Sequence, residues 1–383
     1  MTTSIYLVPG MFGFARIGSL DYFGHVSRAL EARYASRGRR AECHVVDVHP
    51  TASIRRRADS LLTRILDTAA DAGPIHIIGH STGGLDARLL ASPTSRVLRD
   101  ESHRSRAEAL LLRLASITTM NTPHRGTPLA AFFATKSGQQ VLYALMALTV
   151  TGLKLGAPPI ALASALLATL GRISGAAELP LIERVSESLI KVLDDASSRE
   201  LRGFLRLIRA DQGTVIQLTP EAMDIFEASV IDRPDVRYQC VATFAPAAAP
   251  RTIMGSLLSP WSLVSSAIFA VLYNITKDQD PTYPAKSPSP ALHRAVATLL
   301  ADMPPDTAND GVVPFYSQLW GDVVWAGSAD HLDDVGHFPG RKRRGRATEA
   351  EPNVDWLRSG AGFDENRFET VMDRIVDGMV LSE

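Results

Sequence analysis

The sequence predicts an α/β fold in which a mostly parallel sheet is flanked by helices. Short apolar runs alternate with helical patterns over residues 5–88, and such alternation is typical of parallel sheets. Two of these runs lead directly into glycine-containing turns, as strands do at the ligand-binding edge of such a sheet. The chain has 383 residues, 45% of them hydrophobic and 21% charged, which is enough apolar material for a large core.

The overall composition points to no charged partner. With a net charge of −1, the chain has no global field that would favour nucleic acid. Its two cysteines, Cys43 and Cys240, lie in apolar, strand-like runs, and we interpret both as core residues without a disulfide. No signal-peptide pattern precedes the first strand, so we expect a cytoplasmic protein, or a secreted one if a leader was removed.

The predicted core begins with strands at 5–8 and 42–48 and a helix at 53–70. The first strand ends in the loop 9–14, whose two glycines let backbone amides approach a ligand closely; an ordinary strand-to-helix turn is the alternative. Apolar residues recur at helical spacing through 53–70. A Gly-Pro pair then ends this helix and leads into the next strand.

The stretch 74–88 contains the pattern G-x-S-x-G, with Ser81 between Gly79 and Gly83. A serine on a tight strand-to-helix turn needs small residues two positions before and after it, because larger side chains would close the turn. The backbone amide of Thr82 would then point into the site from the N-terminus of the following helix. Because a strand pattern precedes the motif and a helical pattern follows it, we predict Ser81 to be a nucleophile.

The next predicted strand is 110–120, after a highly charged segment, 96–108, that we expect to be a solvated surface. The strand ends in the turn-rich loop 121–128, at the edge where ligands of open α/β sheets bind. His124 in this loop is therefore expected near the site, as a residue that orders the loop rather than a catalytic one.

A mostly helical segment, 130–235, interrupts the alternation. Its apolar part, 141–170, is long enough to suggest a membrane span, but Gly156 and two prolines divide it into pieces too short to cross a bilayer. We expect an inserted helical cap whose apolar face receives a water-insoluble substrate; a pair of core helices is the alternative. The predicted core then consists of 1–129 and 236–383.

The core resumes with a strand at 236–244. The stretch 253–276 carries no charged residue, and we interpret it as a second cap element or a wall of an acyl pocket, with a membrane span or plain core as alternatives. The proline-rich segment 281–290 resembles a linker, and a short helix is expected at 291–301. A final helix is predicted at 364–379, where apolar residues recur at helical spacing.

A nucleophilic serine needs a histidine to accept its proton and a carboxylate to orient that histidine. In an elbow of this type the acid and then the histidine follow the serine along the chain. Asp310 lies in a glycine-containing turn, and only His331 and His337 come after it. We favour His331, because it follows the predicted strand 323–326, and interpret His337 as a structural or site-rim residue.

Two other acids compete with Asp310 for this role. Asp333 and Asp334 lie within one turn of His331, which is awkward geometry for a carboxylate that must face its ring. Asp310 itself could instead serve only its Asn-Asp-Gly turn.

Together these motifs resemble the bacterial true lipases of the α/β-hydrolase superfamily, the group typified by secreted triacylglycerol lipases. Five segments match that family in the expected order: 8–14, the elbow around Ser81, 121–127, 309–311 and 330–333. The resemblance implies an α/β-hydrolase fold with a large inserted helical cap. The segment 130–235 and the apolar stretch after 244 match no part of the family pattern.

The resemblance also implies roles for single residues. It assigns Ser81, Asp310 and His331 to a catalytic triad, and the backbone amides of Met11 and Thr82 to an oxyanion hole.

The family usually has histidine where this chain has Pro9, which leaves open how the oxyanion loop is braced. Asp333 matches a position that binds structural calcium in some relatives, but no second acid stands at the expected separation before Asp310. We therefore expect no cofactor and treat Asp333 only as a calcium candidate.

The predicted function is that of a serine carboxylic-ester hydrolase for apolar esters. An acyltransferase and a hydrolase of lactones or polyesters would use the same triad, and a catalytically silent lipid-binding protein is a further alternative. The basic run 341–346 is interpreted as a solvated loop, with contact to an anionic membrane surface as the alternative. Nucleic-acid binding is not expected, because no aromatic residues interleave this run.

Overall fold

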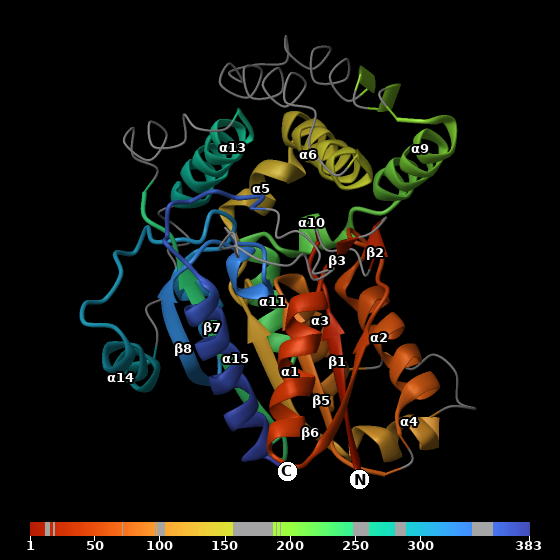
Figure 1. Ribbon diagram of the computed structural model, residues 1–383, viewed down its shortest axis with the longest axis vertical. Helices are drawn as coiled ribbons and strands as arrows, with labels where there is room; N and C mark the ends of the chain where they lie inside the picture. The colour runs from red at the N-terminus through yellow and green to blue at the C-terminus, as the bar shows by residue number, and fades with distance from the viewer. Residues whose placement is uncertain are drawn as a thin grey trace, which may run out of the picture.

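A parallel sheet of six strands forms the centre of the molecule (Figure 1). The computed structural model describes residues 1–11, 16–17, 20–70, 72–95, 97, 104–155, 187–188, 190–191, 193–247, 260–279, 289–338 and 355–383. The strand order is β4-β1-β5-β6-β7-β8, and every neighbouring pair is parallel. The strands are β1 (Thr2–Val8), β4 (Arg40–Val45), β5 (Ile75–His80), β6 (Leu114–Met120), β7 (Arg237–Phe244) and β8 (Asp322–Ser328).

The strand order reverses between β1 and β5, and this reversal positions the site. The chain leaves β1 toward β4 on one side and returns to β5 on the other. Ligands of open α/β sheets bind in the crevice at such a switch point, beyond the carboxyl ends of the strands. The loop that begins at Pro9 and the turn at Ser81 follow these two strands, so they lie side by side at that edge.

Helices cover both faces of the sheet, as the alternating side chains of β1 require (Figure 1). Ile5 and Leu7 pack in one cluster with α1 (Gly24–Ser36) and α15 (Glu365–Val380). Tyr6 and Val8 point the other way and pack with the second set of helices. That set consists of α2 (Ile54–Thr68), α3 (Thr82–Ala91) and α4 (Arg104–Leu111).

The predicted α/β-hydrolase fold is the observed one: a parallel sheet covered by helices, with a serine on the turn after β5. The helices predicted at 53–70, 291–301 and 364–379 correspond to α2, α14 (Pro290–Leu299) and α15. The side chains of Ser53 and Asp364 accept hydrogen bonds from the first turns of α2 and α15, which explains where these helices begin. Cys43 and Cys240 are free thiols in β4 and β7.

The described residues of 130–235 are mostly helical. They include α5 (Pro128–Ala134), α6 (Lys136–Leu155), α9 (Asp195–Ala210), α10 (Gly213–Gln217) and α11 (Pro220–Ser229). Helix α11 packs beside α3, whereas the other four lie beyond the carboxyl edge of the sheet (Figure 1). Helix α13 (Pro260–Lys277) packs beside them, and its buried side chains share one hydrophobic cluster with those of α5, α6 and α9. The described helices include none that is both long and apolar enough to span a bilayer. That the segment receives substrate stays a prediction.

Several expected boundaries were wrong. The strand expected at 110–120 begins only at Leu114, because Leu110 and Leu111 form the last turn of α4 and Leu110 packs into the core. The charged segment 96–108 likewise contains the start of that helix. The strand expected at 42–48 is β4 and ends at Val45.

Other elements were not expected at all: α1, and the short pair β2 (Arg16–Ile17) and β3 (Leu20–Asp21). Helix α1 buries only one narrow stripe of side chains against the sheet, so its apolar signal in the sequence is weak. The expected linker 281–290 falls largely, and the basic run 341–346 wholly, outside the described residues.

Candidate active site

Ser81 lies on the turn between β5 and α3, in a backbone conformation that is unusual for a side-chain-bearing residue. Its φ is 54° and its ψ is −127°, and such strained residues gather at functional sites. The flanking glycines make the turn possible. A Cβ on Gly79 would stand 2.3 Å from the carbonyl carbon of Gly83, and one on Gly83 would stand 2.1 Å from the carbonyl oxygen of Val8. The glycines predicted for a nucleophile elbow are therefore required by close backbone contacts.

The structure brings His331 and Asp310 together. The Nδ1 atom of His331 and the Oδ2 atom of Asp310 are 2.7 Å apart, and the His331 backbone amide donates to the Asp310 carbonyl at 3.0 Å. Both side chains are buried. An imidazole that donates Nδ1–H to a carboxylate keeps Nε2 as a proton acceptor, which is the tautomer that general-base chemistry needs.

The Asp310 carboxylate is held by three other donors. The amides of Val312 and Val313 donate to Oδ1 at 2.8 and 2.7 Å, and the Gln318 side chain donates to Oδ2 at 3.2 Å. These donors fix the orientation of the buried carboxylate, so that its Oδ2 atom faces His331 Nδ1. The turn expected around Asp310 and its acid role are therefore compatible.

The residue before the serine ties the elbow to the histidine loop. The Nε2 atom of His80 is 2.8 Å from the His331 carbonyl oxygen, and the two imidazole rings are 4.8 Å apart. The Asn121 side chain donates to the same carbonyl at 3.3 Å. On the other side, the Tyr22 hydroxyl is 2.7 Å from His80 Nδ1. Burial holds the pKa of His80 well below its usual range, so His80 serves as a neutral bridge.

Between Ser81 and His331 themselves, both of them described residues, no hydrogen bond is formed. Such bonds are often long in unliganded sites and tighten when substrate binds.

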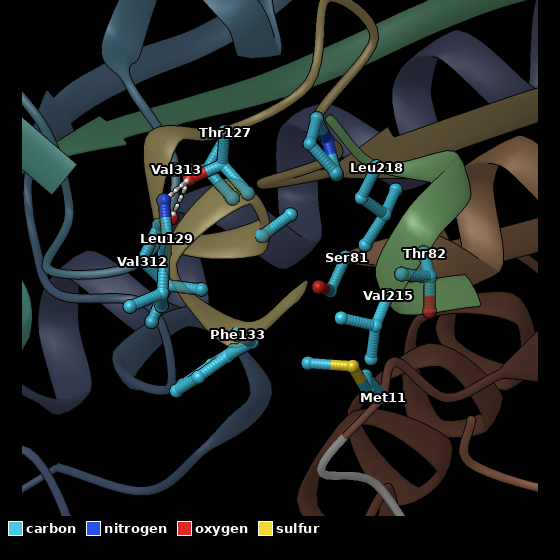
Figure 2. A pocket seen from close by; sticks show the side chains of 12 residues that line it. Met11, Ser81, Thr82, Thr127, Leu129, Phe133, Val215, Leu218, Val312 and Val313 are labelled. Atoms are coloured by element: carbon cyan, nitrogen blue, oxygen red, sulfur yellow. Dashed lines mark hydrogen bonds between the residues drawn. The ribbon is translucent and has the colours of Figure 1, made fainter. Parts of the chain in front are cut away.

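Met11 and Thr82, the expected oxyanion donors, both lie next to Ser81. Both line one small cavity with Ser81, whose hydroxyl oxygen points into that cavity (Figure 2). Met11 lies in the loop that follows β1, and Thr82 is the first residue of α3. A Cβ on Gly10 would stand 2.5 Å from the Ser81 Cβ, so the loop passes directly over the serine.

A buried arginine that the sequence analysis did not single out braces this loop. Arg57 of α2 is fully buried, and its Nη2 atom donates to the Pro9 carbonyl oxygen at 2.5 Å. The same guanidinium binds both carboxylate oxygens of Asp86 in α3, with its Nε atom at 2.9 and 3.2 Å. Burial raises the pKa of Asp86 to about 6, while Arg57 favours its charged form, so the pair is ionised at neutral pH. Arg57 therefore braces the oxyanion loop at Pro9, the position where the family usually has histidine.

His124 lies at the back of the site, buried in the loop after β6. Its Nε2 atom is 3.1 Å from the Thr119 hydroxyl, and the Arg88 guanidinium approaches Nδ1 at 3.0 Å. The ring stacks on Trp320. These contacts fix the loop, which is the role expected of this histidine.

The other acids near His331 do not face its Nδ1 atom as Asp310 does. Asp333 accepts a hydrogen bond from the amide of Asp330, and Asp334 lies 3.9 Å from His80 Nε2. Burial raises the pKa of both carboxyl groups well above the usual range. Among the described residues, no group of three or more acidic, histidine or cysteine side chains is arranged to hold a metal ion.

The cavity at Ser81 is small and almost wholly apolar. Its volume is about 20 Å³, which suffices for roughly one water molecule. Helix α5 contributes Leu129 and Phe133 to its wall, and the α10 region contributes Val215 and Leu218 (Figure 2). The described wall therefore covers the serine closely.

Comparison with known proteins finds bacterial lipases among those that the chain resembles. No family model matches the chain. Over 148 residues it is 31% identical to a triacylglycerol lipase of Pseudomonas fragi, a match that covers 37% of this chain and 43% of the relative. Over 128 residues it is 29% identical to a triacylglycerol lipase of Vibrio cholerae, covering 33% of this chain and 34% of the relative. Over these matched parts, the chain is similar to bacterial triacylglycerol lipases. The matches span less than half the length of either relative.

Solved structures of lipases resemble the whole chain more distantly. Lipase 1 from Pelosinus fermentans aligns with a TM-score of 0.49 at 17% identity, over 93% of this chain and 97% of that protein. The lipase of Staphylococcus hyicus aligns with a TM-score of 0.48 at 16% identity, over 99% and 96%. At such scores the fold assignment depends on the sheet order and the elbow rather than on these alignments.

Proposed function

We propose that the chain is a serine carboxylic-ester hydrolase that acts on apolar acyl esters. The observation that carries this proposal is the 2.7 Å contact between His331 Nδ1 and Asp310 Oδ2, in a loop hydrogen-bonded to the residue next to the elbow serine. The relatives are named triacylglycerol lipases, and this also supports an ester substrate.

In the proposed reaction, the Ser81 oxygen attacks the acyl carbonyl carbon while His331 Nε2 takes its proton. The carbonyl electrons move onto oxygen, and the amides of Met11 and Thr82 stabilise this oxyanion, an effect of about 2.7–4 kcal/mol per donor. The alcohol leaves with the proton from His331. A water molecule then attacks the acyl group with His331 again as base, and the acid and free serine are released.

The cavity wall supports an apolar substrate. Its lining is almost entirely apolar, which favours an acyl chain over a charged group. Because the cavity has room for only about one water molecule, we infer that the walls at α5 and α10 move apart before an ester reaches Ser81.

The test is hydrolysis of p-nitrophenyl esters by the wild type and by Ser81→Ala. We expect the variant to lose at least 10⁴-fold in kcat, on the order of the effect of removing a triad nucleophile, and to keep its melting temperature. Ser92→Ala, at the C-terminal end of α3, is the matched control and should stay active. Addition of an alcohol acceptor, with analysis of the products, separates a hydrolase from an acyltransferase. Unchanged turnover in Ser81→Ala would contradict the proposal.

A further inference from the structure

His49 shapes a tight turn that lies outside the triad. Its Nδ1 atom accepts hydrogen bonds from two successive backbone amides, those of Thr51 at 3.3 Å and Ala52 at 3.1 Å. Both of these residues are fully buried, whereas the His49 ring is half-buried. Two buried amides therefore depend on one ring nitrogen for their acceptor.

The turn in question, residues 49–52, holds the short helix α10. The Thr214 amide donates to the Thr51 carbonyl at 3.0 Å, and the Thr214 hydroxyl donates to the Ala52 carbonyl. In return, the Thr51 hydroxyl donates to the Asp211 carbonyl at 2.7 Å. The next residue of α10, Val215, lines the cavity at Ser81. Displacement of the turn would therefore displace one wall of the cavity.

The same turn is joined to the oxyanion loop through Arg57. The Nη1 atom of Arg57 donates to the carbonyl oxygens of His49 and Pro50 at 3.0 and 3.4 Å, while its Nη2 atom donates to that of Pro9. The turn 49–52 thus stands between two parts of the site, the α10 wall and the loop that carries Met11.

We propose that His49 is a positioning residue for the reaction: by shaping the turn 49–52, it sets both the α10 wall and the oxyanion loop around Ser81. This inference rests on the proposed ester hydrolysis, because it assigns a consequence for kcat to a group that does not touch the substrate. Hydrogen bonds between described residues join His49 to the turn 49–52, and join this turn both to α10 and, through Arg57, to the oxyanion loop.

The charged groups that face His49 are Asp211, Arg56 and Arg57, together with the Leu207 carbonyl. Burial and the two arginines lower the pKa of the His49 ring from 6.5, against the opposing effects of Asp211 and Leu207. The ring is therefore neutral at pH 7, as an acceptor nitrogen must be. As the pH falls, a protonated Nδ1 can no longer accept from the two amides.

The experiment compares His49→Ala, His49→Asn and Thr214→Val with the wild type, using the water-soluble substrates p-nitrophenyl acetate and butyrate. In His49→Asn, the side-chain oxygen stands the same number of bonds from Cα as Nδ1 does and does not titrate. Thr214→Val removes the hydroxyl bond from the other side of the path at nearly constant volume. Ser289→Ala removes the N-cap of the remote helix α14 and controls for loss of stability alone.

We expect His49→Ala to lower kcat about tenfold or more, since even a small misplacement of an oxyanion donor is costly. His49→Asn should stay within about threefold of the wild type and should lose less activity than the wild type between pH 7 and pH 5. Thr214→Val should also lower kcat, but by less than His49→Ala does. In hydrogen exchange, the amides of 213–218 should exchange faster in His49→Ala.

Two results would overturn the inference. The first is a kcat in His49→Ala that matches that of Ser289→Ala at an equal loss of melting temperature. The second is an unchanged exchange rate at 213–218. If instead the wild type hydrolysed no ester, the proposed function would fail, and the exchange measurement would still decide whether His49 holds α10.

Discussion

Among single residues, the contact on which the proposed reaction depends most is the one by which Asp310 orients His331. The carboxylate accepts from the imidazole and from two backbone amides, so its charge is satisfied in a buried place. The sequence predicts Ser81, Asp310 and His331 from their motifs, their order along the chain and the strand before His331, and the structure places Asp310 and His331 in direct contact. Asp310 is preferred over Asp333 and Asp334 because those two lie within one turn of His331, and the coordinates show which carboxylate faces the ring.

Asp310→Asn tests this contact. The amide has almost the same shape but no charge, and it can present a donor to Nδ1, which would favour the wrong tautomer of His331. We expect kcat for p-nitrophenyl butyrate to fall about 10⁴-fold, with little change in KM. Asp322→Asn, on the exposed start of β8, serves as the control. A kcat within tenfold of the wild type would mean that another group orients the histidine.

At the scale of elements, α2 and α3 are joined to the oxyanion loop by one buried ion pair. Arg57 and Asp86 are both fully buried, and Arg57 alone reaches the Pro9 carbonyl. The sequence contained a sign of this. Arg57 lies on the apolar face of the predicted helix, beside Ala58 and Leu61, where a charged residue needs a buried partner. The partner was not predictable, because Asp86 is 29 residues away and the meeting depends on how two helices pack.

Variants that remove Arg57 alone, or Arg57 together with Asp86, should distinguish the effect of this ion pair on stability from its effect on activity. Arg57→Met leaves the Asp86 carboxylate buried and alone, and we expect a loss of about 3–5 kcal/mol in the free energy of unfolding. In Arg57→Met/Asp86→Leu most of that loss should be recovered, because no buried charge remains. Activity should stay low in both variants, since the brace on Pro9 is gone.

Urea unfolding and ester hydrolysis, measured on the same samples, provide the check. Full activity in the stable double variant would show that Pro9 needs no brace from this side chain.

At the scale of the whole molecule, the sheet was predictable and the region beyond it was not. The strands β1, β5, β6 and β7 are short apolar runs, so the local sequence is enough to predict them as strands. The elbow glycines mark the end of β5. Helices α6 and α13 are also apolar and α9 is amphipathic, but their sequences do not show which neighbour each one covers. Their shared cluster forms only in three dimensions. The parts of the site that come from α5 and α10, Phe133 and Val215, were missed for that reason.

The buried histidines give the fold a dependence on pH. Burial lowers the pKa of His337 from 6.5 to about 4. A histidine whose pKa is lowered in the folded state contributes stability above pH 6.5, and this contribution is lost as the pH falls through the folded value. Asp86 has its pKa raised to about 6, so its contribution has the opposite sign and declines as the pH rises from 3.8 to 6.

His337→Gln isolates one of these contributions. Between pH 7 and pH 4, the wild type should lose about 3 kcal/mol more than the variant in the free energy of unfolding, as a shift of this size implies. Urea unfolding at half-unit steps of pH measures the difference. Parallel curves for the two proteins would show that His337 does not stay neutral in the folded state.

If His331 and Asp310 make Ser81 nucleophilic, a fluorophosphonate should label Ser81 covalently. The label is located by mass spectrometry of the peptide that contains residue 81. We expect one phosphonate per chain, attached to Ser81, and at least 100-fold slower labelling in His331→Ala. A label on another residue, or an equal labelling rate in the variant, would contradict the proposed mechanism.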